Sequence, residues 1–532
     1  MKKKQTPFRL RGLGIRIYVL ASLIAAFVIV FYFSQQPGYT DSFYHYNAAV
    51  RVAEGDGFVD DYLWTYIGAS DSLPAPSHLY WMPGTTLIAA LGMVIFGATY
   101  AAAKIGLALC LWGASLLAYW LGWRLGGSSR HAWQAGIVVL FGGFFMRFWG
   151  QADTFAPYAF FGGMTLAFIG LGISSEKNNV RWWVFAGIFA AFSHLIRSDG
   201  LMMLLVGWSV LFFPLDIWAW LRKRAQHATP LRKRVICFVI FTVAYLAAMS
   251  PWLIRNLNTI GTVLPVGGTQ GAWYTSYNDL FSYPPDASAE TLFADGSSLF
   301  VETRVWGLFS GQGAIINFIA IEGIIVLAPF ILIALWRRRH DAFLRPVWIF
   351  ALGIHLAFAL VFPFPGVRGG LFHAAAALMP FWAILGLLGI DDSIDWVVKF
   401  RRKWKPQIAK PLFSSFVVLI IIFLSLQIAL AARFTTRNPQ FYRILAESIP
   451  ENARVMINDP AQLYYYTGIG GVVVPNESPA IALEVAERYA IDYLVLENGG
   501  IPDPMLFETV PNFLTPIDIE LGGATLYAIE RN

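Results

Sequence analysis

The chain has 532 residues, of which 57% are hydrophobic, 16% are aromatic and only 14% are charged. A soluble protein of this length needs more polar surface than this composition supplies, which excludes a water-soluble globule. The formal net charge of +6 comes from short Lys and Arg clusters between apolar runs. Such clusters are typical of cytoplasmic loops and indicate no nucleic-acid partner. The sequence therefore predicts a polytopic α-helical membrane protein.

Apolar windows near twenty residues mark the predicted transmembrane helices. The first window, at 13–33, is too long for a signal peptide and no small-residue cleavage site follows it, so we interpret it as an uncleaved span. Together the windows predict about eleven helices. The others lie at 100–122, 131–149, 155–173, 181–196, 200–219, 234–253, 313–336, 346–362, 371–390 and 411–432.

Basic clusters between the windows set the predicted orientation. They all fall on one side if the N-terminus is cytoplasmic. If the apolar stretch 82–97 crossed the membrane, every later loop would lie on the opposite side from the one that its charges favour. We therefore predict that this stretch is an interfacial or re-entrant helix on the outer face. With an odd number of spans, the chain after about residue 433 lies outside. We expect a multi-pass protein of the plasma membrane, of bacterial origin.

Three predicted outer segments are long enough to carry function, namely 34–99, 256–312 and 433–532. The first two belong to a transmembrane domain at 1–432, and the third is a separate soluble domain. Helices at FYRILAESI, AQLYYYT and SPAIALEVAERYA alternate with strands at ARVMIN, GVVVP and DYLVLE, before a further helix and two short strands. This alternation predicts a small extracytoplasmic α/β domain.

Ionisable residues gather where the predicted spans meet the outer face. The cations are Lys104, Arg147, Arg197, Arg255 and Arg368. The acids are Asp41, Asp153 and Asp199, and the histidines are His45, His78, His194 and His373. Such groups usually face a cavity and one another. A single interfacial arginine is more often a headgroup anchor, and each histidine alone favours a structural role, so the convergence of cations with carboxylates is what indicates a site.

This combination of charges has a chemical interpretation. Arginine recognises the phosphate of an anionic lipid headgroup, and a hydroxyl nucleophile needs a base within hydrogen-bond reach. Carboxylates and arginines at one level beside the membrane therefore indicate group transfer from a lipid phosphate.

Four segments, in order, resemble the GT-C membrane glycosyltransferases, particularly the protein-mannosyltransferase and aminoarabinose-transferase branch. GYTDSFYHYNAAVRVAEGDGF places an aspartate just after the first span and resembles the first outer loop of the family. WGQADTFAPY resembles the second outer-loop acid, LIRSDGLMMLL the Leu-Thr-Arg-Pro-x-Gly stretch, and PWLIRNLNTIG the Pro-Trp-x-x-Arg-Asn motif. The resemblance covers roughly residues 10 to 390, and a soluble outer domain after the last span also occurs in such enzymes.

The resemblance implies roles for individual residues. Asp41 would be the base that deprotonates an acceptor hydroxyl, which then attacks the anomeric carbon of a polyprenyl-phosphate sugar with inversion. Asp153 would orient the acceptor or help to hold a cation. The acceptor would be a lipid, glycan or protein, and membrane lipids would surround the enzyme. Arg255, together with Arg197 and Arg368, would neutralise the leaving phosphate. The other residues expected to bind substrate are His78, Tyr44 and Asn256.

The sequence departs from the family pattern at three places. A serine follows Asp41 where the family often has a second acid, and SHLYWMPG stands where it has a basic residue before two prolines. His78 either replaces that basic group or binds a metal with Asp41, and a divalent cation is the one cofactor left open. Arg197 is followed by a serine and Asp199 instead of proline, so it either binds substrate or forms an internal ion pair.

Two other functional classes remain open. A transporter or flippase for an anionic or lipid-linked substrate would also line a cavity with arginines. Transporters tend to have repeated halves with helices broken at the midplane, and the sequence shows neither feature. A non-catalytic scaffold would tolerate loss of the first-loop carboxylates. The four family-like segments favour the enzyme.

Overall fold

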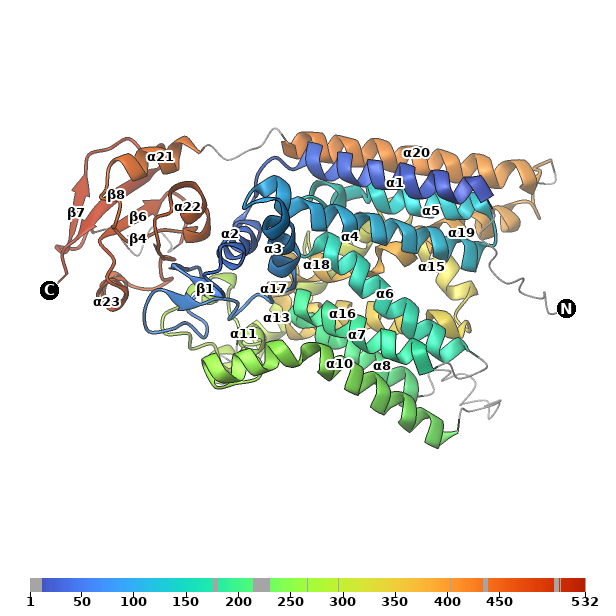
Figure 1. The fold of residues 1–532 in the computed structure, drawn as a ribbon, viewed down its shortest axis with the longest axis horizontal. Coiled ribbons are helices and arrows are strands. Elements are labelled where there is room, and N and C mark those ends of the chain that lie inside the picture. The colour runs from blue at the N-terminus through green and yellow to red at the C-terminus, as the bar shows by residue number, and fades with distance from the viewer. Residues whose placement is uncertain are drawn as a thin grey trace.

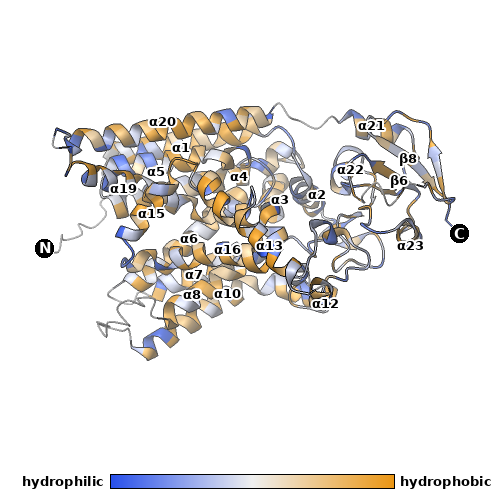
Figure 2. Cartoon of the chain, turned by 180° about the vertical axis from the view of Figure 1, so that it is seen from behind, coloured by the Kyte–Doolittle hydropathy of each residue, from blue (hydrophilic) through white to orange (hydrophobic). Residues whose placement is uncertain are grey.

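The computed structural model describes residues 12–531 apart from 176–179, 214–229, 266, 295, 402, 434–438, 502–506 and 508. A long helical bundle occupies most of the molecule, and a smaller part with a sheet and short helices lies at one end (Figure 1). Figure 2 shows that apolar residues dominate the bundle, whereas the smaller part is mixed. This division matches a membrane-embedded part and an extramembrane part.

Most helices of the bundle are long and apolar enough to cross a membrane. Within the described ranges, the eight candidates are Leu13–Phe33, Tyr100–Gly126, Phe155–Ser174, Leu231–Ile260, Ser298–Glu322, Ala342–Val361, Pro363–Val397 and Pro406–Arg433. Shorter apolar helices are Gly84–Phe96, Val180–Ile196, Ser198–Phe212 and Ala328–Arg337. Helices satisfy their own backbone hydrogen bonds, as a bilayer requires. The predicted polytopic α-helical fold is confirmed.

Figure 1 labels most of the regular helices of the bundle. They are α1 (Gly12–Phe33), α3 (Gly84–Phe96), α4 (Tyr100–Leu121), α5 (Ser129–Phe141), α6 (Phe155–Ser174), α7 (Val180–Ile196), α8 (Leu201–Phe212), α10 (Leu231–Ile260), α13 (Ser298–Phe309), α14 (Ala314–Ile316), α15 (Ala328–Arg337), α16 (Arg345–Leu356), α17 (Pro363–Pro365), α18 (Leu371–Ala375), α19 (Met379–Val397) and α20 (Pro406–Arg433). α1 and α20 run side by side along one edge (Figure 1).

The predicted span at 131–149 is not one continuous helix. α5 ends at Phe141, and Gly142 and Gly143 follow with φ angles of 47° and 59°. These left-handed angles suit glycine and break the helix. A 3₁₀ turn over Gly143–Arg147 comes next. Hydropathy windows count apolar residues and do not detect a break inside an apolar run, so the sequence analysis was wrong here.

The predicted span at 313–336 is also interrupted. A candidate span begins earlier, at Ser298, and α15 begins separately after Ile324 and Ile325, which have positive φ angles of 48° and 60°. The 82–97 segment forms α3, whose thirteen residues reach only about 20 Å, less than the thickness of a bilayer core. A helix of that length suits the expected interfacial or re-entrant position.

The outer segments contain short elements. They are α2 (Thr40–Glu54), β1 (Val59–Asp60), β2 (Tyr62–Leu63), β3 (Ala75–Pro76), α11 (Gly267–Gln270) and α12 (Ala289–Phe293). β1 pairs antiparallel with β3 inside the first outer loop. α2 is followed by Gly55, whose left-handed conformation lets its N–H donate to the carbonyl of Arg51 and ends the helix.

The C-terminal part contains the expected alternation of helices and strands. Its elements are α21 (Gln440–Glu447), β4 (Val455–Met456), α22 (Pro460–Thr467), β5 (Gly471–Val472), α23 (Pro479–Tyr489), β6 (Tyr493–Glu497), β7 (Leu514–Ile517) and β8 (Ala524–Ile529). The sheet order is β2-β5-β4-β6-β8-β7, with β2, β5, β4 and β6 parallel. The helix expected after β6 falls partly on 502–506 and 508, outside the described residues.

A strand of the first outer loop completes this sheet, which the sequence analysis did not foresee. Tyr62 and Leu63 of β2 pair with Gly471 and Val472 of β5. A side chain at position 471 would lie 1.8 Å from the Val455 carbonyl oxygen, so only glycine fits at the start of β5. The first outer loop and the C-terminal part therefore form one packed unit, and the chain around α2 is held from both sides.

Candidate active site

A cavity of about 570 Å³ lies where the bundle meets the first outer loop and the C-terminal part. Ionisable and aromatic side chains share its wall with apolar residues of the bundle. The ionisable residues are Asp41, Asp153, Arg197, Asp199, Arg368, His194 and His373. The aromatic rings include Trp64, Tyr80, Trp81, Tyr274 and Tyr277. A cavity with convergent polar groups is the usual form of a small-molecule site.

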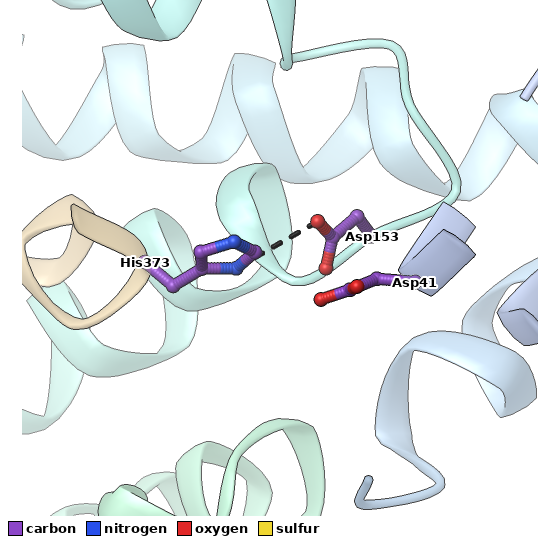
Figure 3. A group of neighbouring side chains, drawn as sticks. All are labelled: Asp41, Asp153 and His373. Atoms are coloured by element: carbon purple, nitrogen blue, oxygen red, sulfur yellow. Dashed lines mark ion pairs between the residues drawn. The ribbon is translucent and has the colours of Figure 1, made fainter. Parts of the chain in front are cut away.

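Asp41 lies in the first turn of α2, where a carboxylate suits the helix dipole. Its side chain points toward Asp153 (Figure 3). Burial raises the pKa of Asp41 well above its ordinary value, and the nearby charge of Asp153 raises it further, while Arg197 acts in the opposite direction. Asp41 therefore holds a proton more readily than an ordinary carboxylate.

Asp153 lies in the loop before α6, and its carboxylate has several partners. The hydroxyl of Tyr39 and the backbone N–H of Thr154 donate hydrogen bonds to it, and Nδ1 of His373 lies 3.6 Å away. Burial acts to raise the pKa of Asp153, but His373, His45 and these hydrogen bonds outweigh it and hold the pKa below the ordinary value. Asp153 is therefore the ionised member of the pair.

Asp41, Asp153 and His373 form a group that can hold a metal ion. One ligand atom from each lies within 4.8 Å of the others (Figure 3). Two carboxylates and an imidazole are suitable ligands for Mn²⁺ or Zn²⁺. Two carboxyl groups this close share either a proton or a cation, and the Asp41 carboxylate has no side-chain hydrogen bond to a described residue. These residues therefore fit a divalent cation.

Arg197 forms the internal ion pair that the sequence left open. Its Nε and one terminal nitrogen donate to the Asp199 carboxylate at 2.8 and 2.9 Å, and that nitrogen also donates to the Gly370 carbonyl at 3.1 Å. This bidentate contact neutralises most of the arginine charge. The pair still lies in the cavity wall, where it fixes the junction of α7 and α8 against the chain before α18.

Arg368 contributes a charge that is not neutralised in this way. It is exposed and lies on a wide helical turn over Gly366–Gly370. Its guanidinium lies 4.6 Å from the centre of the Tyr277 ring, and no described carboxylate lies within ion-pair distance. Arg368 is therefore the arginine of this wall best placed to receive an anion.

Arg255 and Asn256 lie outside the wall of the cavity. The Arg255 guanidinium donates to the carbonyls of Phe58 and Ser77 at 3.3 and 3.0 Å and to Asn256 Oδ1 at 3.1 Å. It also lies over the Trp252 ring. The PWLIRN motif thus fixes the first outer loop, and Arg255 acts on the site through that loop in this structure.

His78 and Tyr44 also lie outside the cavity wall. Both are buried, and the Tyr44 hydroxyl accepts a hydrogen bond of 2.6 Å from the His78 backbone N–H. The His78 ring packs against Tyr44 and His45. The histidine that accompanies Asp41 is His373, so the structure does not place His78 in a metal site with Asp41.

The sequence analysis missed several residues of the wall. Trp64 and Trp81 stack with their ring centres 3.7 Å apart, and Asn458 comes from the C-terminal part. Asn458 is more than 400 positions from Asp41, and no local pattern relates them. His373 was noted only as one of four outer-face histidines, and its position beside two acids was the missing signal.

A hydrogen bond links the C-terminal part to the start of α2. Thr40 Oγ1 donates to Asp459 Oδ2 at 2.8 Å, while Asp459 Oδ1 caps α22 by accepting from the Gln462 N–H at 3.0 Å. Thr40 precedes Asp41. Asp459 therefore connects the first turns of two helices, one of which carries the acid pair.

Replacing Thr40 with valine is expected to lower the turnover rate at this site about tenfold and to lower the unfolding temperature slightly, because valine keeps the shape of threonine but removes one hydrogen-bond donor from the Asp459 carboxylate. Steady-state kinetics and a thermal melt of the purified protein check this. Thr40→Ser keeps the hydroxyl and should keep the rate. Equal rates for valine and wild type would show that this bond does not position Asp41.

No protein-family model and no curated protein matches the sequence. The chain is similar to the structure of the oligosaccharyltransferase AglB from Archaeoglobus fulgidus in complex with an inhibitory peptide and a dolichol-phosphate, with a TM-score of 0.58 and 14% identity over 91% of this chain and 70% of that chain. The same archaeal enzyme in complex with Zn and sulfate gives a TM-score of 0.51, 14% identity, and 90% and 67% coverage.

A similar fold also occurs in ArnT from Cupriavidus metallidurans bound to undecaprenyl phosphate, with a TM-score of 0.53 and 13% identity over 97% of each chain. Likeness at this identity shows the fold alone. The chain therefore has the GT-C fold that its four sequence segments predicted.

Proposed function

We propose that this chain is a membrane glycosyltransferase that moves a sugar from a polyprenyl-phosphate donor to an acceptor hydroxyl on the outer face, with inversion. The observation that carries the proposal is the pair of half-buried Asp41 and buried Asp153 in the wall of a cavity that also contains Arg368. Neighbours of this fold were solved with dolichol-phosphate and with undecaprenyl phosphate, which supports a lipid-phosphate donor.

The wall of the cavity suits such a donor. Its bundle side is apolar and includes Met202, Leu205 and Phe358, which can contact a prenyl chain. Arg368 would bind the phosphate, and the stacked rings of Trp64 and Trp81 offer a flat apolar surface for the sugar. The donor would then span from the lipid-facing side to the acid pair.

The reaction follows from these positions. Asp41 would take the proton of the acceptor hydroxyl as its oxygen bonds to the anomeric carbon, and the bond from that carbon to the lipid phosphate oxygen would break on the opposite side. Arg368 would stabilise the charge on the leaving phosphate. Asp153 would orient the acceptor, and its charge adds to burial in raising the pKa of Asp41. A divalent cation held by Asp41, Asp153 and His373 would supply the positive charge that lets Asp41 ionise.

Removing divalent cations is therefore expected to lower transfer at least about tenfold, since burial and the charge of Asp153 would then raise the pKa of Asp41 with no cation to oppose them, and less of its carboxylate would be free to act as the base. The purified protein is treated with EDTA, passed through a desalting column and assayed with and without added Mn²⁺, Mg²⁺ or Zn²⁺. Binding of Mn²⁺ is followed separately by electron paramagnetic resonance, with Asp153→Asn as the comparison. Full activity after chelation, or equal Mn²⁺ binding by Asp153→Asn, would contradict a cation at this site.

The function itself is tested by incubating membranes that contain the protein with labelled polyprenyl-phosphate sugars. Movement of one label onto an acceptor supports the transferase. A label that crosses a sealed vesicle while still attached to its lipid would instead indicate a flippase. The proposed topology, with the N-terminus cytoplasmic and 433–532 outside, is checked by labelling single cysteines placed at Glu447 and at Arg339 from each side of the membrane.

A further inference from the structure

A second, smaller pocket of about 90 Å³ lies at the C-terminal ends of α1 and α20. It is formed by the chain from 33 to 39, the turn that carries Arg147, and the last turn of α20 with Arg433. None of the described residues lines both this pocket and the large cavity. The two sites nevertheless meet at Tyr39, which lines the small pocket and donates its hydroxyl hydrogen bond to Asp153.

Among the described residues, neither arginine of this pocket has an anionic partner. The Arg147 guanidinium lies 4.7 Å from the centre of the Phe148 ring, and that of Arg433 lies 4.0 Å from the centre of the Tyr32 ring. Neither forms an ion pair or a hydrogen bond with any residue that the structure describes. On the proposed topology both lie at the outer face, where membrane proteins carry few cations. Two arginines that line one small pocket and have no described anionic partner are suited to an anion.

An apolar surface leads along the membrane to this pocket. Leu20, Ile24, Val28 and Tyr32 recur every four residues on α1 and therefore lie on one face, and their side chains are about half exposed. The stripe ends at Tyr32, whose ring lies beneath Arg433. A hydrocarbon chain lying on this stripe would place its headgroup at the pocket. The apolar stripe and the two arginines at its end match the arrangement of a lipid, which has a hydrocarbon chain and an anionic headgroup.

We propose that this pocket binds the phosphate headgroup of a membrane lipid through Arg147 and Arg433. The site goes beyond the proposed sugar transfer, because its arginines lie outside the cavity that would hold the donor. Its ligand would contact Tyr39 and so influence the carboxylate of Asp153, which links lipid binding to the acid pair. The phosphate belongs either to a glycerophospholipid or to a second polyprenyl phosphate, and both present the same charged oxygens to the arginines.

The test measures lipid binding directly and needs no enzyme assay. The full chain in detergent is titrated with short-chain phosphatidylglycerol, phosphatidylcholine or a short polyprenyl phosphate, and bound lipids are counted by native mass spectrometry. Arg147→Gln with Arg433→Gln is expected to weaken binding of phosphatidylglycerol or polyprenyl phosphate, whose headgroups carry a net negative charge, about tenfold, and to leave binding of zwitterionic phosphatidylcholine nearly unchanged. Arg339→Gln, at an exposed arginine that also lies over a tryptophan ring, should bind like wild type.

The outcomes identify the source of the phosphate as well. Loss of phosphatidylglycerol binding in the double variant assigns the site to phospholipids, and loss of polyprenyl phosphate binding alone assigns it to the prenyl lipid. The proposal is overturned if wild type and double variant bind every lipid equally. It is also overturned if phosphatidylcholine binding falls in the double variant as much as phosphatidylglycerol and polyprenyl phosphate binding do. If the double variant does not fold, Arg433→Gln alone is compared with Arg433→Lys, which keeps the charge and should keep part of the binding. Arg368→Gln should leave this site intact, so failure here is distinct from failure of the donor site.

Discussion

Asp41→Asn is expected to reduce sugar transfer by about 10²- to 10⁴-fold, the usual effect of losing a general base. Asparagine has nearly the shape of aspartate but cannot accept the proton of the acceptor hydroxyl. It also removes one carboxylate from the group of Asp41, Asp153 and His373, so any bound cation would be held less tightly. Initial rates with the labelled donor, measured on protein of known concentration, give the size of the effect.

Asp56→Asn is a matched control at the end of the same helix. Asp56 follows α2, its side chain is half exposed, and its carboxylate lies 3.7 Å from Nε of Arg51. Because such an exposed contact contributes little to stability, Asp56→Asn should change neither the rate nor the fold. The unfolding temperature of Asp41→Asn should be equal to or higher than that of wild type, because a buried carboxyl beside a second acid is relieved. Wild-type rates in Asp41→Asn would exclude Asp41 as the base and would leave Asp153 as the only acid of the pair in that role.

The sequence predicted the acids because each lies in a local pattern with a clear signature. Asp41 follows an apolar run of spanning length directly, and Asp153 follows the next outer turn in WGQADTFAPY. Hydropathy placed both residues at the outer ends of predicted spans, at the same depth relative to the membrane. Charged groups at that depth usually face a cavity, so two acids there are expected to share one. Their proximity in the structure is a consequence of that restriction.

Contacts that depend on tertiary packing could not be predicted in this way. Arg255 and Arg368 both lie at the ends of predicted spans. The sequence around each does not reveal that the Arg255 guanidinium donates to backbone carbonyls whereas Arg368 faces the cavity. The addition of β2 to the C-terminal sheet joins residues about 400 positions apart, and two-residue strands carry no alternation to detect. The breaks at Gly142 and Ile324 are set by backbone angles inside apolar runs, which hydropathy does not record.

Arg368→Gln is expected to raise the KM for the donor and to lower kcat, with a combined loss of about 10²- to 10³-fold, as when one preorganised group that stabilises a developing charge is removed. The reason is that Arg368 faces the cavity without a described carboxylate partner, so its charge is available to the phosphate both in the bound donor and as it leaves. Arg368→Lys keeps the charge but not the two-pronged contact and should retain part of the activity. Kinetics at varied donor concentration separate the two effects.

Arg255→Lys provides the contrast, because both arginines were expected to bind phosphate. The Arg255 guanidinium is held by the carbonyls of Phe58 and Ser77, so its replacement should lower the unfolding temperature and leave the donor KM of the folded enzyme nearly unchanged. Donor affinity measured on both variants decides between the two positions. A raised donor KM in Arg255→Lys together with an unchanged one in Arg368→Gln would place the phosphate beside the first outer loop, and the donor would then enter the cavity from the opposite wall.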